Sequence, residues 1–195
     1  MSGYPSLASR RVIAVVATML VFIAFFPAAP AFAAAYSLSI DDVAVAETDA
    51  GTTTATFTVS LSAPAGANPI TVTATSASLP GDTATAGTDY VAGSQLLTFN
   101  TGVSTQPFVV TINGDTIDEG AAETYSVTLS GASVGGGDTV AIGDGLGAGS
   151  ILDDDPLPVI SADTPSVLEA SGSLNFLVSM DRASASVVTV AYARF

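Results

Sequence analysis

The sequence predicts an all-β fold, a seven-stranded antiparallel β-sandwich followed by a truncated second copy of itself. Three observations lead to this prediction. After Tyr36 the chain is rich in Val, Thr, Ile, Ser and Phe, apolar and polar residues alternate with a period of two, and turn residues recur at short intervals. No segment of this part has the periodicity of a helix. Several strand-like runs of this kind over about 120 residues favour two packed sheets.

An export signal is predicted at residues 1–33. Arg10-Arg11 supplies a positive n-region, and the apolar run at 12–26 is short for a membrane span. Two prolines end that run, and the small residues beyond offer a signal peptidase two registers, Ala31-Phe32-Ala33 and Ala33-Ala34-Ala35. We expect a chain that is secreted or displayed at the cell surface, without an integral membrane span. The alternative is an uncleaved N-terminal anchor.

The mature chain, which we expect to begin near Ala34, is strongly acidic. The whole sequence has 4 Lys and Arg against 18 Asp and Glu. Cleavage removes two of the basic residues and none of the acids, so two basic residues face eighteen acids and the net charge becomes −16. Such a surface attracts cations and repels nucleic acid and anionic lipid, so no nucleic-acid partner is expected. The absence of Cys and His excludes disulfides, imidazole metal sites and His-based catalysis.

Each predicted strand has one apolar face. In residues 54–61 the odd-numbered positions are Ala, Phe, Val and Leu, and the even-numbered positions are Thr or Ser. Residues 108–112 and 124–130 repeat this alternation. The seven predicted strands cover residues 37–46, 54–61, 69–76, 95–99, 108–112, 124–130 and 148–152. Their inward faces supply the core that must stabilise a chain without disulfides.

The landmarks of this first unit begin again near its end. The matched pairs are Glu169 with Glu47, Phe176–Met180 with Phe57–Leu61, and Val188–Tyr192 with Ile70–Ala74. Their offsets of 122, 119 and 118 residues indicate a repeat at domain length. We therefore predict a first domain at 36–155 and a partial second repeat at 156–195. Its few strands cannot close a sandwich, which favours a fragment of a longer tandem array over a poorly ordered tail.

Strand order alone places most of the acids at one end of the sandwich. An antiparallel chain reverses at each loop, so the first, third and fifth connections and the exit of the last strand share one end. These segments carry eleven acids, whereas the loops of the opposite end carry only Asp138 and Asp144. The eleven are Glu47, Asp49, Asp82, Asp89, Asp115, Asp118, Glu119, Glu123, Asp153, Asp154 and Asp155.

These carboxylates repel one another unless cations lie among them, because no Lys or Arg is nearby in the sequence. Calcium suits such a site, since it accepts roughly six to eight oxygen ligands in flexible geometry. Magnesium prefers a tighter octahedron with retained waters, and softer metals prefer the missing His and Cys. The charge pattern alone also agrees with a solvated, solubilising face.

Four segments, in order along the chain, resemble the Calx-beta motif. They are Glu47 to Gly51, Ala84 to Tyr90, Asp115 to Tyr125 and Gly149 to Asp155. That motif is known from regulatory calcium-binding domains of sodium/calcium exchangers and from many bacterial surface proteins. The resemblance covers residues 36–155 completely and 159–195 in part. It implies an Ig-like β-sandwich of the Calx-beta kind, with no catalytic activity of its own.

The resemblance also implies a set of calcium ligands, because in the exchanger domains the ions lie at one end of the sandwich. The implied metal ligands are Glu47, Asp89, Asp115, Glu119, Glu123, Asp153, Asp154 and Asp155. The chain departs from the exchanger motif at Asn113-Gly114-Asp115, where that motif has consecutive acids, and one extra residue separates Glu119 from Glu123. We therefore expect fewer ions or weaker binding, with a Kd on the order of 10⁻⁴ to 10⁻³ M.

Three functions agree with these features. The first is an extracellular calcium-binding module for structure or adhesion, in which Ca²⁺ stiffens a tandem array and the partners are neighbouring Calx-beta repeats and other surface or matrix proteins. The second is a metal-independent Ig-like spacer. The third is a non-catalytic appendage of a larger secreted enzyme. An enzyme is not indicated in this chain, because its Ser and Thr residues lack a His or Lys base.

Overall fold

The computed structural model describes residues 33–120 and 122–193. The predicted export signal therefore lies outside the described residues, except for Ala33. Within the described residues no helix combines the length and the apolar character that a membrane crossing requires.

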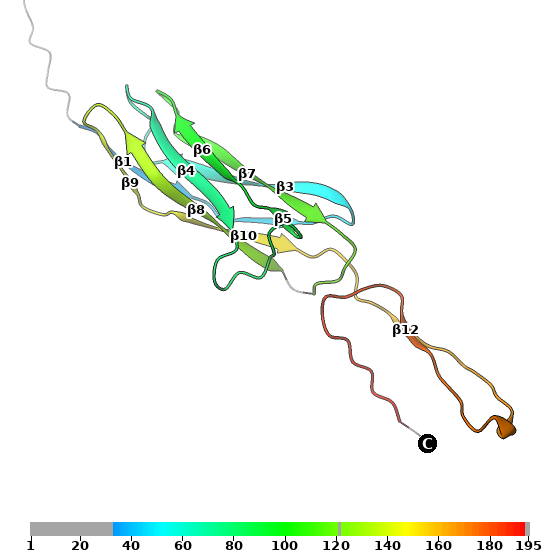
Figure 1. Ribbon diagram of the computed structural model, residues 1–195. Coiled ribbons are helices and arrows are strands. Elements are labelled where there is room, and N and C mark those ends of the chain that lie inside the picture. Colours follow the sequence, from blue (N-terminus) through cyan, green and yellow to red (C-terminus); the bar gives the residue numbers. More distant parts are fainter. Residues whose placement is uncertain (1–32, 121, 194–195) are drawn as a thin grey trace, which may run out of the picture. The chain divides into compact units, whose positions relative to one another are not determined.

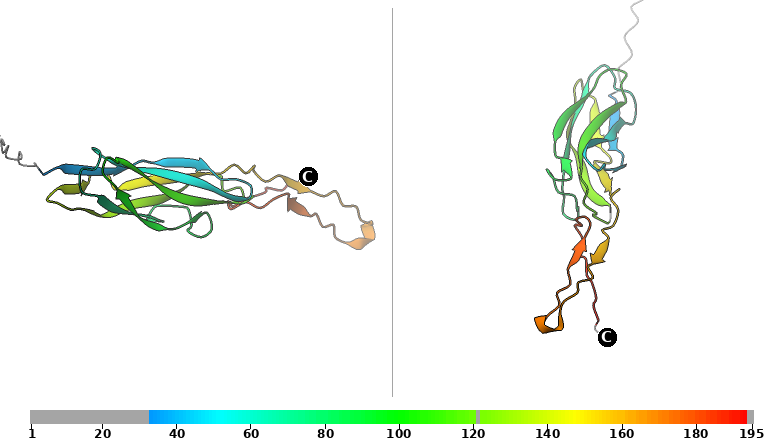
Figure 2. Two further views of the ribbon diagram at one scale, coloured as in Figure 1. Left: turned by 90° about the horizontal axis from the view of Figure 1, so that it is seen from above. Right: turned by 90° about the vertical axis from the view of Figure 1, so that its right-hand side faces the viewer.

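Two five-stranded sheets form the first domain, and the all-β fold predicted from the sequence is confirmed (Figure 1). The strands are β1 (Ala35–Ile40), β2 (Val43–Ala46), β3 (Gly51–Leu61), β4 (Ile70–Ala77), β5 (Tyr90–Val91), β6 (Ser94–Phe99), β7 (Thr105–Gly114), β8 (Glu123–Val134), β9 (Thr139–Ile142) and β10 (Leu146–Leu152). One sheet has the order β5-β7-β3-β1-β9 and the other the order β2-β10-β8-β4-β6. Figure 2 shows the two sheets face to face.

The period-two alternation produces the core between these sheets. In β3 the side chains of Phe57 and Val59 are 0% exposed, while the hydroxyl residues that alternate with the apolar ones along the strand face outward. Tyr125 of β8 stacks on Tyr90 of β5 with ring centroids 4.6 Å apart and meets Phe57 edge to face at 6.0 Å. These aromatic contacts join the two sheets, because Phe57 and Tyr90 belong to one sheet and Tyr125 to the other.

The first predicted strand, 37–46, is divided between the two sheets. Its first half, β1, pairs antiparallel with β3, and its second half, β2, pairs in parallel with β10. The change occurs at Asp41 and Asp42. The amide of Thr58 donates to Oδ1 of Asp41, and the amide of Ala148 donates to Oδ1 of Asp42. Each carboxylate thus binds a strand of a different sheet, which fixes the crossing point.

The described residues of the first domain form ten strands, so the predicted count of seven is wrong. Besides the divided first strand, the predicted loop 131–147 holds the end of β8 and all of β9, and Tyr90–Val91 adds a short strand beside β7. The prediction of a purely antiparallel sandwich is also wrong, because β9 pairs in parallel with β1, as β2 does with β10. The extra strands are short, and β9 has no buried alternation that a sequence pattern could reveal.

A separate two-stranded sheet follows, made of β11 (Ile160–Ala162) and β12 (Val178–Met180), with a 3-10 turn η1 (Glu169–Ser171) between them. Ile160 faces Met180 in this pair, as Leu38 faces Leu61 in β1 and β3. Ile160 lies 122 residues after Leu38, and Met180 lies 119 residues after Leu61. Both numbers equal offsets of the repeat found in the sequence.

A hydrogen-bond motif recurs with the same spacing. The amide of Leu177 donates to Oδ1 of Asp163 at 2.8 Å, and the amide of Asp163 donates to the carbonyl of Leu177 at 3.0 Å. Asp41 and Thr58 form the same reciprocal pair in the first domain. This local agreement extends the sequence repeat to the backbone, while the partial second repeat stays a prediction.

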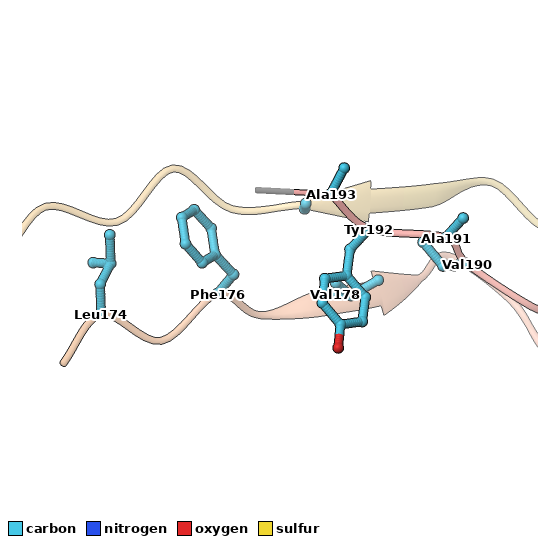
Figure 3. Close-up of a pocket in the computed structure, with 8 residues that line it drawn as sticks. Leu174, Phe176, Val178, Val190, Ala191, Tyr192 and Ala193 are labelled. Atoms are coloured by element: carbon cyan, nitrogen blue, oxygen red, sulfur yellow. The ribbon is translucent and has the colours of Figure 1, made fainter. Parts of the chain in front are cut away.

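The apolar side chains after β11 lack the cover that their counterparts have. Phe176 is 63% exposed, whereas the matching Phe57 is 0% exposed. Figure 3 shows Leu174, Phe176, Val178 and neighbouring side chains around a cavity of about 710 Å³. The few strands of this region thus leave their apolar face open among the described residues.

The contact between Gly149 and Tyr125 leads to a prediction about core packing. A Cβ atom at position 149 would overlap the Tyr125 ring, and Tyr90 and Phe57 hold that ring in place. We expect Gly149→Ala to lower the free energy of unfolding by about 1–3 kcal/mol, measured by urea denaturation, because an added methyl group forces a packed core apart.

The matched control is Gly93→Ala. A Cβ atom at position 93 has no atom within 4 Å, and Gly93 does not have positive φ. This variant should keep the wild-type stability or gain slightly. Equal stability of the two variants would contradict the proposed tight packing at Gly149.

Candidate metal centre

Six of the eight predicted ligands form two carboxylate clusters at one end of the sandwich. Glu47, Asp154 and Asp155 form cluster A, and Asp89, Glu119 and Glu123 form cluster B. Within each cluster one carboxylate oxygen of every residue lies within 4.8 Å of the others. We call this end the carboxylate pole; it comprises both clusters together with Asp115 and Asp153. Figure 1 shows β7 and β10 ending there, where β8 begins.

Parallel pairing of β2 with β10 brings cluster A together. Because the two strands run in the same direction, Glu47 after β2 and Asp153 after β10 leave the sheet at the same edge. The amide of Glu47 donates to the carbonyl of Leu152 at 3.0 Å, which extends the pairing to the last residue before the acids. Glu47 itself is only 3% exposed. The sheet therefore positions a buried carboxylate beside Asp154 and Asp155.

Cluster B is held by the turn before β5 and by the start of β8. The carboxylate of Asp89, only 8% exposed, accepts the amide hydrogen of Thr85, and the carbonyl of Asp89 accepts from Asn113 at 2.9 Å. Next to it, Tyr90 is 0% exposed and fixes the turn to the core. Glu123, the first residue of β8, pairs with Ile151 near the end of β10. Clusters A and B thus lie on neighbouring strands.

Asp153 and Asp115 lie beside the clusters, but backbone amides occupy several of their oxygen positions. Oδ2 of Asp153 accepts from the amides of Glu119 at 3.1 Å and Gly120 at 2.9 Å. Oδ1 of Asp153 accepts from Asp155, and Oδ1 of Asp115 accepts from Ile117 at 2.8 Å. Asp153 therefore ties the segment before β8 to the exit of β10 and orients the acids around it.

Burial and mutual repulsion raise the pKa values of the clustered acids. In cluster A, burial first, and then the charges of Glu119, Asp115 and other acids, raise the pKa of Glu47 to about 7. In cluster B, burial first, and then the hydrogen bond and charge of Asp89, raise the pKa of Glu123 to about 8. Because Glu119 of cluster B raises the pKa of Glu47 in cluster A, the charges of one cluster act on the other.

The remaining shifts have the same direction. Burial, followed by repulsion from Asp89 and other acids, raises the pKa of Glu119. Desolvation, followed by repulsion from Asp49 and other acids, raises the pKa of Asp155. Among the described residues the only ion pair joins Arg182 to Asp181, which is not part of the pole. Protein cations in the described part of the chain therefore do not offset this repulsion.

Three carboxylate oxygens at the pole are buried and lack a hydrogen-bond partner among the described residues. They are Oε1 of Glu47, Oε2 of Glu123 and Oδ2 of Asp155. Leaving a buried polar atom unpaired costs about 1–3 kcal/mol, and more when the group is charged. Both clusters contain such an oxygen, and their ligand atoms are all carboxylate oxygens. The residues present therefore fit a hard divalent cation.

The other acids assigned to this end have different surroundings. Asp49 acts on the pKa of Asp155, so it lies near cluster A, although it was not among the predicted ligands. Asp49 lies in the same connection as Glu47, between β2 and β3, and this position in the sequence already indicates that it is near cluster A. Asp82 accepts from the amide of Leu79 at 2.8 Å and thereby closes a turn.

Asp118 has a contact that the sequence did not reveal. It is 3% exposed, and its Oδ2 accepts the hydroxyl hydrogen of Ser184 at 2.9 Å. Its carbonyl accepts from the amide of Ala185 at 2.9 Å. Asp118 therefore binds the segment after β12, and in the sequence it directly precedes Glu119 of cluster B.

Comparison with known proteins adds the family. The Calx-beta domain family matches residues 33–155. Among solved structures, the chain is similar to the apo-form Calx CBD1 domain, with 24% identity, a TM-score of 0.48, and coverage of 62% of this chain and 98% of that one. CBD12 from CALX1.2 is 24% identical, with a TM-score of 0.47, and the match covers 61% of this chain and 46% of that one. The calcium binding domain CBD12 of CALX1.1 is 25% identical, with a TM-score of 0.49, and the match covers 60% of this chain and 44% of that one.

A comparison with curated protein sequences finds no match. The family assignment therefore rests on the match to residues 33–155, which make up more than half of the sequence. This match includes all four motif segments on which the resemblance was based, and it confirms that resemblance. The chain belongs to the Calx-beta domain family.

Proposed function

We propose that the carboxylate pole binds calcium and that the chain is a non-catalytic extracellular module, in which the bound ion stiffens a tandem β-sandwich array. The observation that carries this proposal is the presence of unpartnered buried oxygens, Glu47 Oε1, Glu123 Oε2 and Asp155 Oδ2, in both clusters. A bound cation supplies the positive charge that the described side chains do not provide.

The donor set selects the kind of ion. Each cluster offers three carboxylates from loop or strand-end positions, which can act as mono- or bidentate ligands. Calcium accepts such irregular oxygen sets, whereas magnesium requires a tighter octahedron. Cluster A would hold one ion through Glu47, Asp154 and Asp155, and cluster B another through Asp89, Glu119 and Glu123. Asp115 and Asp153 would add negative charge and orient the loops.

Extracellular placement follows from two features of the sequence. The export signal at 1–33 directs the chain out of the cytoplasm. The expected Kd, on the order of 10⁻⁴ to 10⁻³ M, suits extracellular calcium and not a cytosolic sensor. Adhesion and structural support are the functions that such an array serves best, with neighbouring repeats and other surface or matrix proteins as partners.

Calcium should stabilise the folded chain. An ion that binds only the folded state adds RT ln(1 + [Ca²⁺]/Kd), so at millimolar calcium the expected gain is about 1–2 kcal/mol, or roughly 3–8 °C in Tm. The measurement is thermal unfolding with 5 mM CaCl₂ and with EGTA. MgCl₂ at equal ionic strength is the control for charge screening and should give a smaller shift. An unchanged Tm in calcium would contradict the proposal.

Glu47→Gln should separate the ion's contribution from the cost of the buried charge. The variant removes a ligand of cluster A, so we expect calorimetry to show a calcium affinity at least about tenfold weaker, equivalent to about 1.4 kcal/mol. In EGTA the same variant should be more stable than the wild type, because a repelled carboxylate is gone.

Asp144→Asn is the matched control, since it removes one charge from an acid that belongs to neither cluster and leaves both clusters intact. It should keep the calcium affinity. A metal-independent spacer, the alternative function, predicts instead that calcium alters the stability of none of the three proteins.

The metal-free chain should lose stability as the pH rises. Glu47 and Glu123 have folded-state pKa values of about 7 and 8, above the ordinary value of 4.5. Between pH 4.5 and 8 the folded state thus retains protons that the unfolded state releases, and the stability present at low pH is lost through this window. Unfolding of metal-stripped protein at pH 5.5 and pH 8 tests the sign.

Calcium should reverse this trend, because ligand carboxylates must lose their protons before they bind an ion. The increase in Tm caused by calcium should therefore be larger at pH 8 than at pH 5.5. A metal-free stability that rises over this range would show that Glu47 and Glu123 ionise without cost, and would contradict the electrostatic basis of the proposal.

A further inference from the structure

We propose that the peptide bond between Ala33 and Ala34 is the processing site and that Asp138 binds the α-ammonium group which cleavage creates on Ala34. The sequence alone offers a signal peptidase two registers, one that cuts after Ala33 and one that cuts after Ala35. The structure favours the first, because the residues between the two cuts already belong to the sandwich.

Ala34 is bound by its backbone on both sides. Its amide donates to Oδ1 of Asp138 at 2.8 Å, and its carbonyl accepts from the amide of Thr139 at 2.8 Å. Its side chain packs against the core, and Ala35 then begins the pairing of β1 with β9. A cut after Ala35 would remove all of these contacts, whereas a cut after the exposed Ala33 keeps them.

The carboxylate of Asp138 has neutral partners before cleavage. Oδ1 accepts from the Ala34 amide, and Oδ2 lies 3.5 Å from Nδ2 of Asn68. Among the described residues, the only ion pair, between Arg182 and Asp181, does not involve Asp138. This carboxylate is therefore in position to accept a charged donor at the place of the Ala34 amide.

Hydrolysis supplies that donor. Water adds across the Ala33–Ala34 bond, the released segment leaves with the carboxylate of Ala33, and Ala34 keeps the nitrogen. An α-amino group with a pKa near 8 is protonated at neutral pH, so the nitrogen becomes an ammonium group. A neutral hydrogen bond to Asp138 thereby becomes a charge-assisted one, which is shorter and stronger. Processing thus fastens β1 to β9 at the edge of its sheet.

The first experiment identifies the cut. The full chain is expressed with its export signal, and mass spectrometry determines the N-terminus of the exported protein. We expect the mature chain to begin at Ala34. Two matched variants assign the register: Ala31→Tyr places a large residue in the first register only, and Ala35→Tyr in the second only, at an exposed position. Processing should stop in the first variant and continue in the second.

A mature chain that begins at Tyr36, or an exported chain that retains residues 1–33, would overturn the assignment. These outcomes do not depend on calcium, so they leave the proposed function to be judged by its own tests.

The second experiment measures the contact with Asp138. Asp138→Asn is introduced into the chain that begins at Ala34 and into one with a six-residue Gly/Ser extension before Ala34, which keeps an uncharged amide at that position. Thermal unfolding in EGTA should show a decrease in Tm that is about 2–4 °C larger in the Ala34 form.

Asp144→Asn is the control, because it removes the same charge at the other end of β9, where the carboxylate of Asp144 accepts from the amide of Leu146. It should change Tm equally in the two forms. Equal effects of Asp138→Asn in both forms would show that Asp138 does not bind the new terminus.

Discussion

Repulsion among carboxylates that the fold forces together is the constraint on which the rest of this domain depends. The parallel pairing of β2 with β10 fixes Glu47 at the acidic exit of the last strand, and the start of β8 adds Glu123. Neither residue can escape into solvent without breaking a strand end that also supports the core. The domain therefore stores unfavourable electrostatic energy in its metal-free state, and a divalent cation is the simplest way to release it.

Packing and electrostatics meet in the same few residues. Tyr90 follows Asp89 and stacks on Tyr125, which lies two positions beyond Glu123 in β8. The aromatic pair holds two acids of cluster B at a fixed separation while their charges oppose it. Asp153 contributes in another way, because its carboxylate accepts from the amides of Glu119 and Gly120 and prevents that segment from moving away. Contacts of the protein itself thus position these acids.

Much of this arrangement could be predicted from the sequence, and the rest depends on distant contacts. Alternating residues in β3, β7 and β8 identified the sandwich, and loop parity placed Glu47 and Glu123 at one end. The alternation of loops between the two ends could not show that the oxygens of Asp153 accept from backbone amides, because these hydrogen bonds depend on how the segment at Glu119 folds. The crossing at Asp41 did leave a signal that the prediction of one strand passed over, because the apolar positions change there from even numbers to odd numbers. The partner of Asp41, Thr58, lies in another strand and could not be predicted from this pattern.

The division of the first strand also determines how the domain would bear tension. The chain enters through β1 and β2 and leaves through β10, and β2 lies parallel to β10. A pull on the two ends draws these neighbouring strands in opposite directions along their length, so their ladder of hydrogen bonds is loaded all at once. A domain whose end strands separated one bond at a time would yield more readily. Parallel pairing of β2 with the last strand of the domain, β10, therefore suits this sandwich to a mechanical load.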